Sequence, residues 1–313
     1  MKRKIFILLI CFFVCSYMSF SENYSLFRKN GSYGIINEDR KVIIEPAYEW
    51  ISIYENAILC GTYDGIDEVY DKSLRLLYTD SWNAFNYISE NEFLLRESFT
   101  GREKLLNLKT GDITIDFDRD KYIKGYGYRD NLALVLGYGG LFIIEDRKGN
   151  VILSDIRDAH SVYTEGMLAV ILENGKSGFV NKNGKLVIET SFYINFDDYG
   201  PKIRPIIRYY FNDNYALVKN ADEKWVQYTI KGDMTPLPEN IVPVCYCYSN
   251  GLVPVLNTKT NKYGYMDPKL NIVIPFKFSD AEGFSGSYAV VKYDDKDAVI
   301  DKKGNIYFCE EFQ

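Results

Sequence analysis

Short apolar stretches alternate with polar turns along most of the chain, and one pattern recurs eight times between Tyr24 and Phe308. Each copy has a strand with a small or apolar centre, a polar turn, and an aromatic-aliphatic strand ending in Asn or Asp. Residues 167–181 and 288–301 are the clearest copies. A unit of this size cannot bury its own apolar face, so the pattern predicts an all-β array of stacked units.

The copies align on the centres of their first strands, at Ser25, Ile58, Phe93, Ala133, Ala169, Ala216, Pro254 and Ala289. The second strands end at Asn37, Asp71, Asn107, Asp146, Asn181, Thr229, Asp267 and Asp301. A spacing of roughly 38 residues suits three or four β-strands. The Asn or Asp, with a Gly soon after it in several copies, is typical of hairpin turns. A third strand follows in several units, and Pro46 and Pro275 are expected to end two of these strands.

Two segments carry the pattern in most detail: Tyr33-Gly34-Ile35-Ile36-Asn37 leading to Pro46, and Tyr263-Gly264-Tyr265-Met266-Asp267 leading to Pro275. They resemble the bacterial WG-repeat family, in which an aromatic-Gly strand ends in Asn or Asp before a turn and an aliphatic strand. The Trp-Gly pair itself is absent, because tyrosines stand before both glycines. The resemblance implies an all-β tandem array and transfers no catalytic residue.

An antiparallel array must protect its exposed strand edges, and closure into a ring achieves this. We therefore predict a single domain over residues 22–313, built of about eight tandem three- to four-stranded β units in a closed propeller-like ring. An open β-repeat stack is the alternative.

The N-terminus has the pattern of a secretory signal peptide over residues 1–21: Met1-Lys2-Arg3-Lys4, an apolar run, then Ser19-Phe20-Ser21. Export would take the protein to the periplasm, the cell surface or the medium. An uncleaved anchor and lipid attachment at Cys11 or Cys15 are alternatives. Removing this segment changes the net charge from −6 to −9, which disfavours nucleic-acid binding.

Four cysteines remain after residue 21, namely Cys60, Cys245, Cys247 and Cys309. Buried thiols and one long-range disulfide both stay open, although Cys245 and Cys247 lie two apart in an expected strand and cannot easily bond each other. A single histidine, His160, disfavours zinc binding and histidine-dependent catalysis. No cofactor or metal is expected.

Three other motifs favour ordinary structural interpretations. Residues 116–120 alternate carboxylates but lack the Gly and Glu of a calcium loop, so they predict a solvated acidic edge. The acidic run 294–297 predicts a hairpin turn. The glycines in residues 125–127 and 137–140 predict turns between strands. Many tyrosines stand at repeat spacing and are expected to fill seams between units: Tyr33, Tyr70, Tyr263, Tyr265, Tyr288 and Tyr307.

The longest interval between units contains an insertion with two prolines, three basic residues and several aromatics. Inserted loops on repeat scaffolds often carry recognition. The residues predicted to contact a protein or glycan are Lys202, Arg204, Arg208, Tyr209 and Tyr210; a neutral, self-packed insertion is the alternative.

The predicted function is a non-catalytic, monomeric, exported scaffold that binds a protein or glycan at the cell envelope. An envelope hydrolase or glycan-processing enzyme, with carboxylates converging in a central channel, is one alternative. A purely structural envelope protein is another. Close, buried carboxylates lining a pocket would favour the enzyme.

Overall fold

A computed structural model describes residues 24–313, apart from residues 55–56, 82, 90–91, 98–102, 115–121, 130, 138, 161–162 and 193–206. Its regular elements are antiparallel strands and one short 3₁₀ turn, η2 (Cys309–Glu311). The predicted signal peptide lies outside the described residues. None of the helical segments among the described residues is long and apolar enough to cross a membrane.

The strands form seven sheets, and six of these have three or four strands. The first three are β1 (Ser25–Lys29), β2 (Ser32–Ile36), β3 (Val42–Tyr48); β4 (Trp50–Ile53), β5 (Ala57–Gly61), β6 (Ile66–Asp71), β7 (Leu76–Ser81); and β8 (Asn83–Ser89), β9 (Glu92–Glu97), β10 (Glu103–Asn107), β11 (Ile113–Thr114). The last three are β19 (Tyr215–Lys219), β20 (Trp225–Thr229), β21 (Met234–Pro236); β22 (Ile241–Pro243), β23 (Val253–Asn257), β24 (Lys262–Met266), β25 (Ile272–Phe278); and β26 (Asp280–Ser285), β27 (Tyr288–Tyr293), β28 (Lys296–Asp301), β29 (Ile306–Phe308). The seven-stranded sheet contains β12 (Tyr122–Arg129), β13 (Leu132–Gly137), β14 (Phe142–Asp146), β15 (Val151–Ala159), β16 (Met167–Leu172), β17 (Ser177–Asn181) and β18 (Leu186–Glu189).

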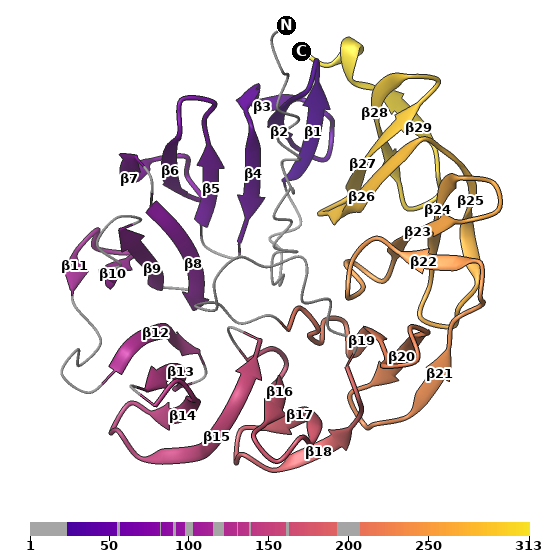
Figure 1. Cartoon of the computed structure of the whole chain (residues 1–313). Helices are drawn as coiled ribbons and strands as arrows, with labels where there is room; N and C mark the ends of the chain where they lie inside the picture. The colour runs from indigo at the N-terminus through magenta and orange to yellow at the C-terminus, as the bar shows by residue number, and fades with distance from the viewer. Residues whose placement is uncertain are drawn as a thin grey trace, which may run out of the picture.

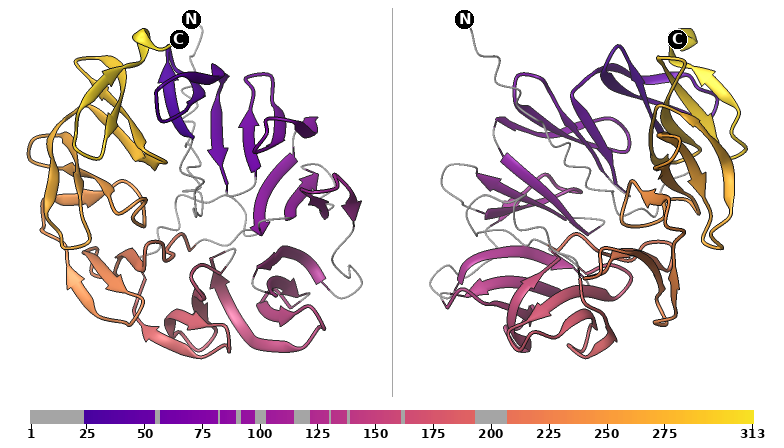
Figure 2. Two further views of the ribbon diagram at one scale, coloured as in Figure 1. Left: turned by 180° about the vertical axis from the view of Figure 1, so that it is seen from behind. Right: turned by 45° about the vertical axis from the view of Figure 1, so that its right-hand side comes forward.

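The sheets follow one another around a ring, and the first lies beside the last (Figure 1 and Figure 2). The all-β class and the propeller arrangement are thus confirmed. The expected count of eight units is not confirmed, because six blades stand as separate sheets of three or four strands. The remaining strands merge through β15, where Ile156 pairs with Phe142 of β14 and with Leu172 of β16. A bulge follows Ile156; the residues before it pair with β14 and those after it pair with β16.

The repeat predicted the strands and their turns well. All eight predicted centres lie in strands, and the side chain at the end of the second strand typically caps the turn that follows. Asp301 Oδ1, for example, accepts hydrogen bonds from the N–H groups of Lys303 (2.9 Å) and Asn305 (3.0 Å). Asn37, Asp146 and Asn181 each make the same pair of bonds. These side chains stabilise the turn by replacing water at its backbone donors.

The prediction that Pro46 and Pro275 end their strands is wrong. Both β3 and β25 continue past the proline, because each strand bulges around it. Tyr263 pairs with Phe278 and Tyr265 with Ile274, so a step of two residues along β24 corresponds to four residues along β25. Proline is tolerated since these are edge strands of their sheets. The bulge brings the Ile274 carbonyl against Gly264, where an added Cβ would lie 2.6 Å from the oxygen. Gly34 meets the Ile44 carbonyl in the same way.

The core lies between neighbouring blades. Ile35 of β2 packs with Ile51, Ile58 and Cys60 of the next sheet, and similar clusters follow around the ring. No disulfide links the four cysteines after residue 21, and all four are buried. Burial raises the pKa of the Cys309 thiol to about 12, so this group stays protonated.

Candidate functional site at the closing seam

The closing seam is the contact between the first sheet (β1–β3) and the last (β26–β29), where the ring closes. Hydrogen bonds cross it in both directions: Leu26 N–H donates to Ser285 Oγ (2.9 Å), and Ser287 N–H donates to Ser25 Oγ (3.0 Å). These residues are about as far apart in sequence as the chain allows. The seam therefore exists only in the closed ring.

A buried ionic cluster occupies the centre of the seam. Arg28 on β1 contacts three carboxylates of the last sheet: Asp280 Oδ2 (3.0 Å), Glu282 Oε1 (3.2 Å) and Asp297 Oδ1 (3.0 Å). Tyr33 on β2 donates its hydroxyl hydrogen to Glu282 Oε1 at 2.5 Å. The side chains of Arg28 and Glu282 are only 15% and 10% exposed. A guanidinium with five donors suits this convergence of acceptors.

The electrostatics of this cluster are set by burial. Burial raises the pKa of Glu282 to about 7, although Tyr33 and Arg28 act in the opposite direction. Burial by itself would lower the pKa of Arg28, but Glu282, Tyr33 and Asp280 raise it, so the guanidinium stays charged. The close carboxylates are thus paired with Arg28 between two sheets.

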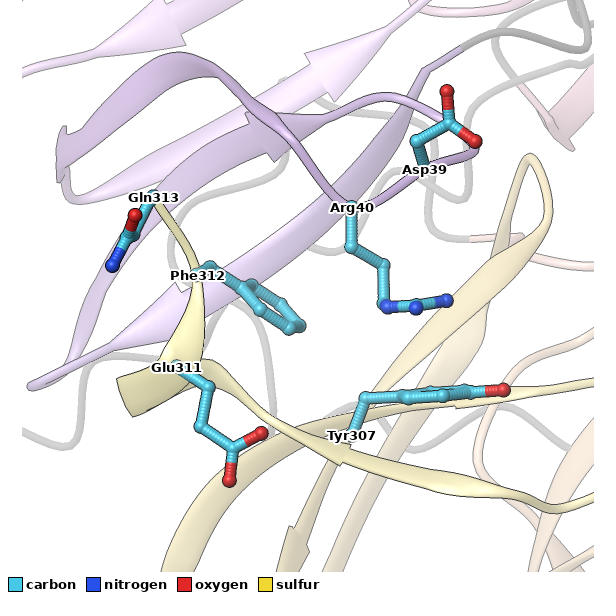
Figure 3. Close-up of a pocket in the computed structure, with 6 residues that line it drawn as sticks. All are labelled: Asp39, Arg40, Tyr307, Glu311, Phe312 and Gln313. Carbon is cyan, nitrogen blue, oxygen red and sulfur yellow. The ribbon is translucent and has the colours of Figure 1, made fainter.

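A small pocket of about 290 Å³ lies beside the seam, where the β2–β3 turn meets β29 and η2 (Figure 3). Its lining residues are Asp39, Arg40, Tyr307, Glu311, Phe312 and Gln313. The Arg40 guanidinium carbon lies 4.1 Å from the Tyr307 ring centroid, and its Nη1 donates to the Tyr288 hydroxyl (3.0 Å). The basic group is therefore held by two tyrosines. The lining residues bring one guanidinium, two carboxylates and two aromatic rings to the pocket.

The described part of the insertion includes only Arg208, Tyr209 and Tyr210 of the predicted binding residues. Lys202 and Arg204 lie outside the described residues, and Arg208 is half-buried. Tyr209 is buried against Phe192, with ring centroids 5.1 Å apart, and donates its hydroxyl hydrogen to the Lys219 carbonyl (3.0 Å). Tyr210 is also buried, and its hydroxyl lies 3.1 Å from Cys247 Sγ. The tyrosines serve the core, and partner binding by the three basic residues stays a prediction.

The other motifs have mixed outcomes. Residues 116–120 lie outside the described part. The acidic run is a hairpin turn as predicted, with positive φ at Asp294 (48°) and Asp295 (60°) between β27 and β28. The turn at residues 137–140 is confirmed by the Gly140 N–H to Gly137 carbonyl bond (3.0 Å). Residues 125–127 are not a turn, because they lie within β12 at a bulge. The described residues include no group of three or more His, Cys, Asp or Glu side chains that could hold a metal.

Sequence reasoning identified Tyr33 as a residue that fills a seam, and it missed Arg28 and Glu282. The only signal was that both sit at strand positions of the first and last units. In a closed ring these units are neighbours, so charged residues on their facing sides are candidates for pairing. The pairing itself needs the three-dimensional fold.

An all-β ring closed non-covalently between its first and last sheets defines a repeat protein of the β-propeller class. The family model for the WG containing repeat matches residues 33–59 and 263–296, which confirms the resemblance to WG repeats in these two segments. The matched segments hold Gly34 and Gly264, two of the glycines that face a carbonyl of a bulged strand. A search of curated protein sequences found no match.

Solved structures show the same fold. Apo AztD from Citrobacter koseri is 10% identical, with a TM-score of 0.53 over 91% of this chain and 92% of that chain. The C-terminal WD40 domain of Sif2 is 12% identical, with a TM-score of 0.50 over 90% of this chain and 93% of that one. At such identities the likeness shows the propeller fold alone.

Proposed function

We propose that this protein is an exported, non-catalytic scaffold that binds a protein or polymer ligand at the cell envelope. The observation that carries the proposal is a row of exposed aliphatic side chains at one repeated position. Each follows the residue that ends the second strand by five places and begins a strand whose first residues pair with a neighbour on one side only. We call Leu76, Val151, Met234 and Ile272 the outer row.

The outer row is unusually exposed for large apolar residues. The exposed fractions are 46% for Leu76, 55% for Val151, 52% for Met234 and 38% for Ile272. β7, β21 and β25 lie at the periphery of the ring, and β15 begins there (Figure 1). Single exposed aliphatic residues are common on protein surfaces, but recurrence at an equivalent position on several blades favours a contact surface. Aliphatic side chains suit a protein ligand better than a glycan.

The charged residues support binding over hydrolysis. The convergent carboxylates at the closing seam are paired with Arg28 and hold the ring together, which leaves their oxygens committed to structural contacts. The envelope location rests on the predicted signal peptide, residues 1–21. Cell fractionation tests that part of the proposal, since we expect the protein outside the cytoplasm and shortened by that segment.

The binding role is tested by affinity capture from envelope extracts, followed by reconstitution with the purified candidate. The informative variant is Val151→Lys/Met234→Lys/Ile272→Lys. Val244→Lys is the matched control, because Val244 is an aliphatic residue that is 45% exposed outside the outer row. We expect the wild-type protein and the control to retain one envelope component that the triple variant loses. Equal retention by all three proteins, or no reconstituted complex, would contradict the proposal.

A further inference from the structure

The backbone N–H groups of the outer-row positions face away from their own sheets. In the first unit, Asn37 N–H donates to the Lys41 carbonyl (3.1 Å), which makes these two residues a hydrogen-bonded pair. In an antiparallel ladder such pairs alternate with pairs whose N–H groups point outward. The next pair is Ile36 with Val42, so the Val42 N–H points out of the sheet edge. It donates to the Gln313 carbonyl at 3.0 Å.

The same geometry recurs at all four outer-row residues. The bond that precedes them runs from Asp71 to Arg75 (3.0 Å), from Asp146 to Asn150 (3.0 Å), from Thr229 to Asp233 (2.9 Å) and from Asp267 to Asn271 (3.0 Å). The N–H groups of Val151, Met234 and Ile272 therefore face outward as the Val42 N–H does. Within the described residues, none of these three N–H groups donates to another element. Each position combines an exposed aliphatic side chain with an available backbone donor.

The chain itself shows how such a position is filled. Residues 312–313 lie against the edge of β3, and Phe312 has extended backbone angles (φ −78°, ψ 136°). Its ring contacts Phe27 edge-on, with centroids 5.6 Å apart, and packs with Val42 in one apolar cluster. An extended segment thus pairs with the outward N–H and places an aromatic side chain beside the aliphatic residue.

Prolines limit how far this pairing can extend. Pro236 and Pro275 follow Met234 and Ile272 by two and three residues, and they offer no N–H to a partner. Such prolines protect edge strands from uncontrolled association. A partner therefore finds a short donor site at the start of the strand, and several such sites on different blades would act together.

We propose that Val151, Met234 and Ile272 bind short, extended peptide segments that carry an aromatic residue. The segment adds to the unpaired side of the strand's first residues through the outward N–H and contacts the aliphatic side chain, a mode in which the main chain supplies affinity and side chains supply specificity. This inference rests on the proposed binding function and names its partner class.

The probe is a synthetic peptide copying residues 306–313, with serine in place of Cys309, added to the ¹⁵N-labelled purified protein. We expect concentration-dependent shifts of the Val151, Met234 and Ile272 amide resonances, while Val244 is unaffected. A peptide with Phe312→Ala should bind more weakly, and Val151→Lys/Met234→Lys/Ile272→Lys should weaken binding about tenfold. Absence of shifts at these amides, or shifts confined to Val42 or to the pocket around Arg40, would overturn the proposal.

The two proposals can fail separately. If the triple variant keeps its envelope partner as the control does, the proposed binding function of the outer row fails, whatever the peptide does. If the peptide shifts the three amides but no envelope component is captured, the peptide site stands and the envelope function fails. A folded triple variant, verified by its circular dichroism spectrum, is required for either conclusion.

Discussion

Replacement of Gly264 by alanine tests the physical reason for the glycine that follows the aromatic residue in the repeat. The added Cβ would lie 2.6 Å from the Ile274 carbonyl oxygen and 3.1 Å from both the Phe276 N and its ring. The nearest atom belongs to the backbone, so it cannot turn aside as a flexible side chain would. The bulge of β25 must move or the pairing of β24 with β25 must loosen.

The expected cost follows from two opposing effects. Forcing one extra carbon into a packed site costs about 1–3 kcal/mol, and the reduced freedom of the unfolded chain returns about 0.4–1 kcal/mol. We expect Gly264→Ala to lower the free energy of unfolding by about 1–2 kcal/mol, measured by urea denaturation with circular dichroism. Gly139→Ala is the matched control, because no atom lies within 4 Å of its added Cβ and its φ is not positive. If both variants shift the urea midpoint equally, or Gly264→Ala shifts nothing, the close approach is not the reason for the glycine.

Three further predictions concern the seam and the turns. The pKa of Glu282 is about 7 in the folded protein and ordinarily 4.5, so the folded state binds more protons than the unfolded state between these pH values. The free energy of unfolding should therefore fall by at most about 3 kcal/mol as pH rises from 4.5 to 7. Glu282→Gln should flatten this slope in urea titrations. Arg28→Met should cost about 3–5 kcal/mol at pH 8, where the folded variant must either keep Glu282 charged without its partner or protonate it, and clearly less at pH 5, where Glu282 is already protonated; an equal loss at both values would argue against the ion pair. Asp301→Ala should cost about 1 kcal/mol by removing the acceptor for two backbone N–H groups, whereas Asp301→Asn, which keeps an acceptor, should stay near wild type in thermal unfolding.

The local parts of the fold could be predicted from the sequence because local chemistry determines them. Alternation of apolar and polar residues gave the strands, and Asn or Asp at the end of a strand gave the turns that it caps. The merged sheet around β15 could not be predicted, since it depends on a bulge after Ile156 that carries no distinctive residue. Proline was misjudged at Pro46 and Pro275, because the pattern does not reveal that these strands lie at sheet edges and bulge there.

The candidate sites were harder to predict, because they depend on contacts between distant units. Tyr209 and Tyr210 stand in an insertion that breaks the repeat, which suggested exposure, yet both rings fill the core between blades. In seven of the eight units the residue five places after the end of the second strand is aliphatic, and the third unit has Asp112 there. The exposure of the outer row and its outward N–H groups became evident only with the order of the strands in each sheet.

The closing seam explains why its charged residues depart from the repeat. Strand register places Gly61 at the position of Arg28 in the second unit and Lys292 at that position in the last. A guanidinium is thus not part of the repeated pattern. The seam joins two ends of the chain that no covalent connection holds together, unlike successive blades, which are linked by a loop. An arginine that binds three carboxylates of the last sheet supplies a directional contact at this one place. Loss of Arg28 should therefore open the ring here first, with hydrogen exchange rising in β1 and β26 before it rises in β16 and β17.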